Sequence, residues 1–214
     1  ITNPNFQISP DLNDERGFNI DFGVRGTKTN KLYFDASLYF LYYRNRIGTV
    51  WITRNNKANY NLPLTTAPYF QFRTNVSQSR TMGFEMIVEA DWWKIIINDM
   101  SSNKLSTFLN FSLNDSRYIF SNEPAIENNR VELVPPITIK TGCTIANNNF
   151  SFSYQFSYTQ EHFTDATNSR YHYHGIVGLI PSYLTMDISG KINIKEIQFE
   201  FGINNLTNEF YFTR

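Results

Sequence analysis

Phe150-Ser151-Phe152-Ser153-Tyr154-Gln155-Phe156-Ser157-Tyr158-Thr159 is the stretch that decides the fold. Aromatic residues occupy every even position and polar residues every odd position, without a break. Because successive side chains of a β-strand point to opposite faces of the sheet, this period of two predicts a strand with one apolar and one polar face. The predicted strand covers residues 150–159.

The same alternation occurs in seven further stretches, and none of them shows the period of an amphipathic helix. One parity is kept from Phe70 to Ala90, which predicts a single very long strand with an unbroken apolar face. Polar turns between the stretches indicate hairpins, so we predict an all-β antiparallel meander of about eight strands. The further predicted strands cover residues 17–25, 32–40, 70–90, 105–114, 137–145, 184–192 and 197–204.

The predicted connections differ in length at the two ends of the sheet. Short polar turns cover residues 26–30, 146–149 and 193–195, whereas long loops cover about 53–69, 115–135 and 161–181. The link at 92–103 is of intermediate length. Short turns at one end and long loops at the other are typical of outer-membrane β-barrels, whose long loops are extracellular. The pattern therefore predicts part of a transmembrane barrel wall.

The composition agrees with a membrane-facing sheet. Aromatic residues make up 16% of the chain, and several lie near predicted strand ends, as at membrane interfaces. Lys plus Arg and Asp plus Glu number 19 each, so no basic field predicts a nucleic-acid partner. No run approaches the roughly 18 apolar residues that a membrane helix requires. The aromatic residues near strand ends are Tyr42, Tyr43, Trp92, Trp93, Tyr158 and Tyr183.

Two other architectures share this alternation. A soluble secreted β-sandwich that serves as a binding module also has one apolar face per strand. A complete eight-stranded outer-membrane barrel that acts as an adhesin or anchor has the same number of strands. The long strands and one-sided loops favour a wall segment of a larger barrel, but both alternatives stay open here.

Five segments resemble the TonB-dependent outer-membrane receptors, in particular the ferric dicitrate receptor-like branch. The most specific is Asn205-Leu206-Thr207-Asn208 with Tyr211-Phe212-Thr213-Arg214, which is similar to the segment that precedes the family's final strand. The other four are Gly23-Val24-Arg25-Gly26 followed by Leu32 to Ile47, Arg80-Thr81-Met82-Gly83-Phe84-Glu85, His162-Phe163-Thr164-Asp165-Ala166-Thr167-Asn168, and Gly178-Leu179-Ile180-Pro181-Ser182-Tyr183 with Asp187.

The resemblance implies a barrel of 22 strands around an N-terminal plug, driven by the TonB complex. Residues 1–214 then form part of the barrel domain, about eight of its later strands, and the plug and final strand lie outside this sequence. The implied function is uptake of a ferric chelate, iron dicitrate or siderophore-like, across the cell outer membrane. The implied partners are the TonB complex, outer-membrane lipid, lipopolysaccharide and the chelate; no bound cofactor and no nucleic acid is expected.

All three histidines lie in one predicted extracellular loop, which makes this loop the candidate ligand site. Arginine and histidine suit an anionic ferric chelate, because its carboxylates accept charge-assisted hydrogen bonds. Direct ligation of a metal is a second interpretation, but the spacing matches no closed zinc motif, and no metal site is predicted. The predicted ligand-binding residues are His162, Asp165, Arg170, Tyr171, His172 and His174.

Charged residues elsewhere in the chain permit further predictions. Arg44 and Arg46, at the top of the second strand, suit lipopolysaccharide phosphates or a solvated loop start. No nucleophile elbow, P-loop, zinc-protease or dinucleotide motif is present, so we do not expect an enzyme. A lumen-facing set would line a substrate path or pair with the plug, and comprises Arg73, Glu85, Glu89, Lys140 and Glu200.

Overall fold

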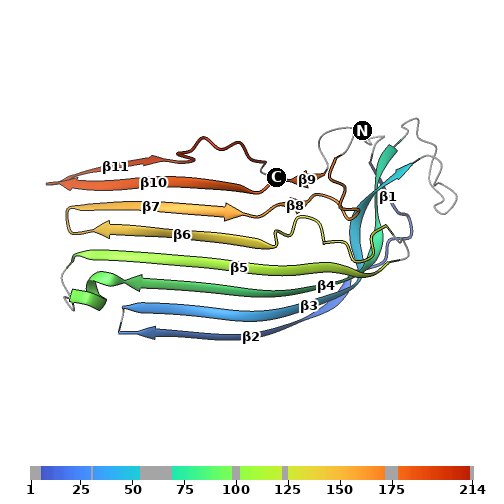
Figure 1. The fold of residues 1–214 in the computed structure, drawn as a ribbon, viewed down its shortest axis with the longest axis horizontal. Helices are drawn as coiled ribbons and strands as arrows, with labels where there is room; N and C mark the ends of the chain where they lie inside the picture. The colour runs from blue at the N-terminus through green and yellow to red at the C-terminus, as the bar shows by residue number, and fades with distance from the viewer. Residues whose placement is uncertain are drawn as a thin grey trace.

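One curved antiparallel sheet dominates the computed structural model, which describes residues 6–29, 31–53, 69–97, 102–121, 125–171 and 178–212 (Figure 1). Eight long strands lie in the spatial order β11-β10-β7-β6-β5-β4-β3-β2. The predicted all-β antiparallel meander is confirmed. The long strands are β2 (Arg16–Lys28), β3 (Leu32–Thr53), β4 (Tyr69–Asp91), β5 (Lys104–Ser121), β6 (Ile137–Ala146), β7 (Phe150–Thr159), β10 (Tyr183–Ile194) and β11 (Ile197–Ile203).

Smaller elements that the alternation did not predict flank this sheet. β1 (Phe6–Ile8) pairs in parallel with β4, and β8 (His162–Phe163) pairs with β9 (Leu179–Ile180) as a separate ribbon between β7 and β10. A short π-helix, Trp93–Ile97, follows β4. Within the described ranges, no helix is long and apolar enough to cross a membrane.

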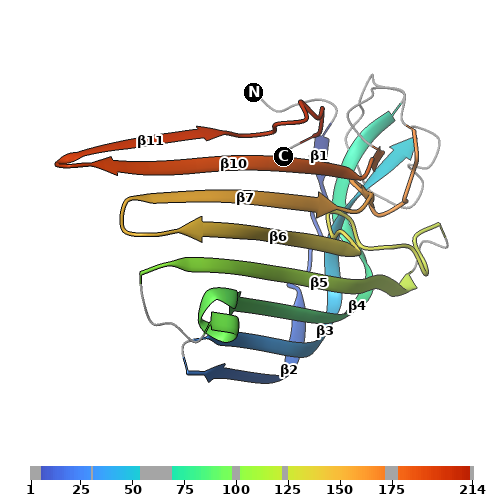
Figure 2. The same ribbon diagram turned by 60° about the vertical axis from the view of Figure 1, so that its left-hand side comes forward.

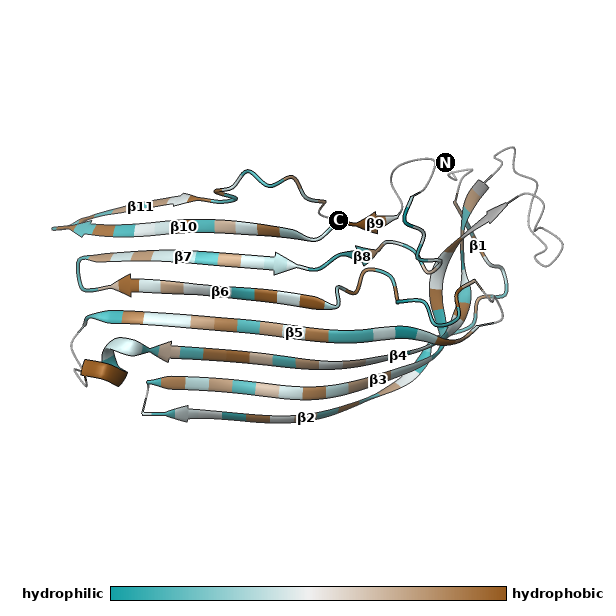
Figure 3. Cartoon of the chain, viewed as in Figure 1, coloured by the Kyte–Doolittle hydropathy of each residue, from teal (hydrophilic) through white to brown (hydrophobic). Residues whose placement is uncertain are grey.

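The two faces of the sheet differ in chemistry along continuous cross-strand rows. Figure 3 shows the alternation as apolar and polar bands along each strand. A direct row on one face consists of Val24, Ala36, Met86, Phe111, Ile139, Tyr158 and Leu184. The adjacent row on the opposite face consists of Ser37, Glu85, Ser112, Thr138 and Thr159.

The apolar face is open to its surroundings. Phe22 is 77% exposed and Ile20 is 62% exposed, and no second sheet of the described part covers them. A β-sandwich would bury these side chains in a dry interior, so that alternative is disfavoured. β2 and β11 form the two edges of the sheet and do not pair with each other, so the sheet is an open arc rather than a closed eight-stranded barrel.

Beyond the regular part of the sheet, β3 and β4 bend away, as Figure 2 shows. The register between them shifts on both sides of Arg46, and Asn45 adopts a left-handed φ of 53°. A β-bulge inserts an extra residue and bends the strand, so the side chains beyond it exchange faces. The bulges therefore separate Phe70 and Phe72, which are fully buried, from the exposed Met82 lower on the same strand.

Two predictions about this region are wrong for the same reason. The apolar parity does not keep one face from Phe70 to Ala90, because the bulges reverse it. Arg73 alternates with buried Phe72 and lies across from Thr49, so it does not share a face with Glu85 and Glu89. The second long loop was predicted to begin at residue 115, but β5 continues to Ser121.

Candidate ligand-binding loops

At the long-loop end of the sheet, two connections pack together on the tops of β3, β4 and β5. We call residues 125–136 and 162–170 the loop cap. Tyr118 belongs to the same parity of β5 as Ser112, so the core under the cap lies on the polar side of the sheet. The buried residues of this core are Val50, Phe70, Phe72, Val76, Tyr118, Ile126, Val131 and Ala166.

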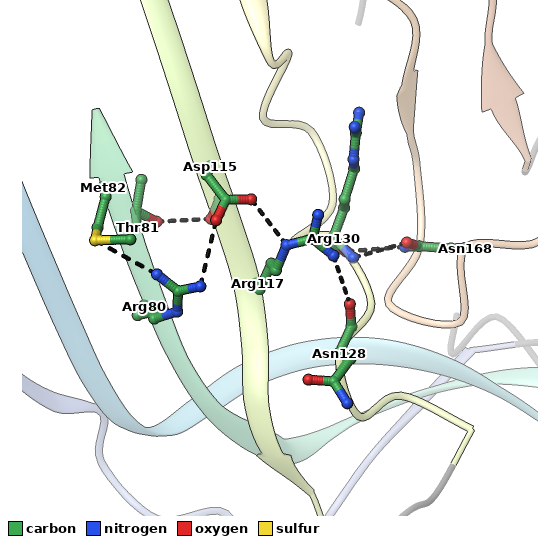
Figure 4. Close-up of polar contacts among 9 residues, drawn as sticks. Arg80, Thr81, Met82, Asp115, Arg117, Asn128, Arg130 and Asn168 are labelled. Atoms are coloured by element: carbon green, nitrogen blue, oxygen red, sulfur yellow. Dashed lines mark hydrogen bonds and ion pairs between the residues drawn. The ribbon is translucent and has the colours of Figure 1, made fainter. Parts of the chain in front are cut away.

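An asparagine joins the two parts of the loop cap. Asn168 accepts a hydrogen bond from the Arg130 backbone amide through Oδ1 and donates to the Arg130 carbonyl through Nδ2, both at 2.8 Å (Figure 4). Asn129 Nδ2 also donates to the Ala166 carbonyl at 3.0 Å, and the Leu133 amide donates to the Phe163 carbonyl at 2.8 Å. The cap is therefore held by hydrogen bonds as well as by hydrophobic contact. We call the two bonds between Asn168 and the Arg130 backbone the clasp.

Asp165, a predicted ligand residue, is 2% exposed and shapes the turn from inside. Its Oδ1 accepts from the Thr167 amide at 2.9 Å and from the Thr167 hydroxyl. This is the local Asx-type bonding by which aspartate organises turns. The role of Asp165 as a ligand contact stays a prediction, and the geometry gives it a structural role in the turn that leads to Asn168.

Gly178 lies where the loop comes back to the sheet, beside Thr164 and Arg170. Gly178 has φ 145°, and a Cβ built on it would come within 2.8 Å of the Arg170 carbonyl oxygen. Its amide donates to Thr164 Oγ1 at 2.7 Å, and its carbonyl accepts from the Thr164 amide at 3.0 Å. Only glycine tolerates that backbone conformation and that close approach together. The loop ends are thereby held beside each other.

The predicted ligand residues that the structure describes occupy one loop but differ in accessibility. Arg170 is exposed, and Tyr171 is 93% exposed. His162 is half-buried in β8, with Nδ1 3.1 Å from the Gln160 carbonyl oxygen. His172 and His174 lie outside the described residues. Among the described residues, no group of three or more His, Cys, Asp or Glu is arranged to hold a metal ion.

The electrostatic feature of the cap is a buried tyrosine bound to a carboxylate. The Tyr118 hydroxyl donates to Glu132 Oε2. Burial raises the pKa of Tyr118 well above its usual range, and the negative charge of Glu132 raises it further. Tyr118 thus stays a neutral donor, as a buried partner of a carboxylate requires. Sequence reasoning missed Tyr118, Asn129, Glu132 and Asn168 as residues that hold the site.

Replacing Asn168 by glycine tests this account of the loop cap. Glycine tolerates the φ of 54° at this position, so the change removes the amide bonds without strain. Leaving both Arg130 backbone groups without their partner is expected to cost about 1 to 3 kcal/mol. In the full-length protein, hydrogen exchange at the Arg130 amide should become about tenfold faster or more.

The control for this measurement is Asn148→Gly, in the short turn at the other end of the sheet. Asn148 is exposed and its side chain is not used in the clasp. Its replacement should leave exchange at Arg130 unchanged. Unaltered exchange in the Asn168 variant would contradict the clasp.

Residues 1–206 match the family model described as TonB dependent receptor-like, beta-barrel. The chain belongs to this family. The comparison with curated proteins gave no match.

Solved structures of larger receptors share the fold of this TonB-dependent receptor barrel segment. The unliganded ferric citrate transporter FecA aligns with TM-score 0.70 and 16% identity, over 94% of this chain and 28% of that chain. The ferric yersiniabactin uptake receptor FyuA from Yersinia pestis aligns with TM-score 0.62 and 13% identity, over 92% and 26%. The ferric-catecholate import receptor Fiu from E. coli aligns with TM-score 0.63 and 12% identity, over 94% and 24%.

The chain spans about a quarter of the length of these receptors, and at such identities the likeness shows the fold alone. The resemblance predicted from the sequence motifs is confirmed at the level of the family. The predicted assignment to a barrel wall is confirmed with it.

The polar face of this sheet carries a cleft near its short-turn end. This cleft has a volume of about 590 Å³ and contains both signs of charge. Lys94 Nζ lies 3.1 Å from Asp91 Oδ2 in its wall. The remaining charged residues of the cleft wall are Lys31, Glu89 and Lys104. The cleft is therefore a paired polar surface rather than a single-sign binding pocket.

Proposed function

We propose that this chain forms part of the wall of an outer-membrane receptor that imports a ferric chelate, iron dicitrate or siderophore-like, with energy from the TonB complex. The observation that carries the proposal is the family match over residues 1–206. The exposed apolar face supports a place in the outer membrane, because transmembrane barrels present an apolar band to lipid. Family membership also supports transport rather than catalysis.

The ligand class rests on the long-loop end of the sheet. Arg170 and Tyr171 are exposed where a solute would first meet the protein, on a loop that the clasp holds in place. A guanidinium forms paired hydrogen bonds with carboxylates, which suits a citrate-type chelate. The proposed entry of energy is through a TonB contact made by a plug domain, as the resemblance implies.

Uptake by whole cells tests the proposal. Cells that express the full-length receptor should accumulate radioactive iron from ferric citrate or a siderophore, and accumulation should stop when TonB is deleted. Accumulation that is independent of both the receptor and TonB would refute the proposed function. The solutes to be tested are ferric citrate, a ferric catecholate and a copper complex. The proteins of similar fold include a ferric citrate transporter, a ferric-catecholate receptor and the copper transporter OprC.

Replacing Arg170, His172 and His174 together by serine tests the proposed ligand loop. Loss of charge-assisted contacts of about 1.5 to 3 kcal/mol should weaken ferric citrate binding by the full-length receptor roughly tenfold or more. Isothermal titration measures the affinity. Lys195→Ser, in the short turn at the opposite end, is the control, and unchanged affinity in the triple variant would retire this loop as the site.

A further inference from the structure

Five arginines lie together where the apolar face meets the long-loop end. Arg80 has the parity of Met82 and Phe84 on β4, and Arg117 has the parity of Leu113 on β5, so both share the face of the apolar residues. The side chain of Arg80 lies 3.4 Å from the Met82 sulfur, which confirms that both point to the same face. We call Arg16, Arg44, Arg80, Arg117 and Arg130 the outer arginine cluster.

The strand register opposes these arginines directly to one another. Arg16 pairs with Arg44, Arg80 with Arg117, and Arg117 with Arg130. Like charges that face each other across strands destabilise a sheet. Three such pairs in one patch indicate that an anion bound from outside offsets the repulsion.

The protein itself supplies little negative charge here. Asp115 alone serves two arginines: its Oδ2 lies 3.3 Å from Arg80 and its Oδ1 lies 2.8 Å from Arg117 Nε (Figure 4). Arg117 also donates to the Asn128 carbonyl at 3.1 Å. Within the described ranges, no carboxylate pairs with Arg16, Arg44 or Arg130. The cluster therefore keeps a large excess of positive charge.

The position of the cluster is set by the residues beside it. The cross-strand row through Arg80 and Arg117 begins with Phe18 and Tyr42, whose rings lie 5.5 Å apart. Aromatic rings of this kind mark the level where hydrocarbon gives way to headgroups. Arg80 and Arg117 are thus at headgroup height, and Arg16 and Arg44 are one row farther out. Lipid phosphates occupy this level.

We infer that the outer arginine cluster binds the phosphates of lipopolysaccharide in the outer leaflet. The inference rests on the proposed function, because that places the long-loop end outside the cell. Arginine binds phosphate through two parallel hydrogen bonds, and the partly exposed Arg80 and Arg117 are 29% and 39% accessible for this. The apolar face below would hold the acyl chains of the same molecule.

The chelate is not the ligand of this cluster, because the cluster lies on the lipid side and the solute passes on the polar side. Arg46, which was predicted together with Arg44 to meet lipopolysaccharide, belongs elsewhere. It pairs with Glu15 at 3.4 Å and stacks its guanidinium 5.6 Å from the centre of the Tyr43 ring. The bulge next to Arg46 separates it from Arg44.

The test measures lipid retained by the purified full-length receptor. The receptor is stripped of lipopolysaccharide with detergent and a divalent-cation chelator, placed in nanodiscs of phosphatidylethanolamine, and titrated with lipopolysaccharide. Parallel titrations use lipopolysaccharide whose lipid phosphates have been removed. Native mass spectrometry counts the bound lipid. In the variant Arg80→Gln/Arg117→Gln/Arg130→Gln, affinity for the phosphorylated lipid should fall about tenfold or more, because three charge-assisted contacts are lost.

Two matched variants separate charge from folding. Arg25→Gln changes an arginine on the polar face, opposite Asp35, and should leave lipid retention unchanged. Arg80→Lys/Arg117→Lys/Arg130→Lys keeps the charge and should retain most of the affinity. All variants should show the same heat-modifiable migration as the folded parent.

Several outcomes would overturn the inference. These are equal affinity of the glutamine variant and the parent, an equal loss for the dephosphorylated lipid, and full competition by millimolar inorganic phosphate, which would indicate a general anion site. If native mass spectrometry shows that the glutamine variant loses a co-purified protein but keeps its lipid, the cluster is a protein contact instead. Lipid binding is measured in the absence of a ferric chelate. A parent receptor that takes up no iron would therefore refute the proposed function, while the lipid measurement would still test the arginine cluster.

Discussion

Leu109→Arg is expected to destabilise the folded receptor in a bilayer by about 2 to 4 kcal/mol. Leu109 lies on the apolar face near the middle of β5, between Val88 on β4 and Thr141 on β6. An arginine there has to place its charge in hydrocarbon, where water cannot solvate it. Urea unfolding of the full-length receptor in lipid vesicles, followed by tryptophan fluorescence, measures the difference.

The neighbouring residue provides the control for that experiment. Asn110 points to the opposite face, between Ile87 and Lys140, and is exposed. Asn110→Arg adds the same side chain at the same depth and should cost less than about 1 kcal/mol, from its repulsion with Lys140. An equal cost at both positions would contradict a wall with one lipid face.

Phe72→Ala is expected to destabilise the folded loop cap by about 3 to 5 kcal/mol, because a large-to-small change in a buried core leaves a cavity. Phe72 is fully buried, and Phe70, 6.4 Å away between ring centres, is its aromatic neighbour. The cavity removes contacts beneath Ile126 and Val131, which belong to the same core. Limited proteolysis of the full-length receptor should then cut within residues 125–136 much faster.

Tyr171→Ala is the control for the loop-cap prediction. Tyr171 is 93% exposed, so its removal leaves no cavity and should not change cleavage in residues 125–136. If Phe72→Ala left the proteolysis pattern unaltered, the buried cluster would not be what holds the loops. Ferric citrate affinity should weaken in the Phe72 variant as well, because the loop that carries Arg170 rests on this core.

Residue types along the sequence could predict only part of the candidate site. The grouping of histidines and Arg170 in one loop depends on sequence distance alone, so it could be predicted. Asp165 looked the same as a ligand carboxylate, since nothing local distinguishes a buried turn residue from an exposed one. The bonds from Asn168 to Arg130 join residues 38 positions apart, and no local pattern announces such a contact.

Local alternation along the chain determined that this protein is a sheet with one apolar and one polar face, because a period of two admits only that arrangement of side chains in an extended strand. It also predicted the hairpins at the short polar turns, because a short turn brings two neighbouring strands side by side. The tertiary structure decided where that pattern reverses and which distant residues meet. Bulges beside Arg46 send Phe70 and Phe72 into a core, and the register between β4 and β5 sets Arg80 against Arg117. Both depend on pairing between strands, which the identity of a single residue does not encode.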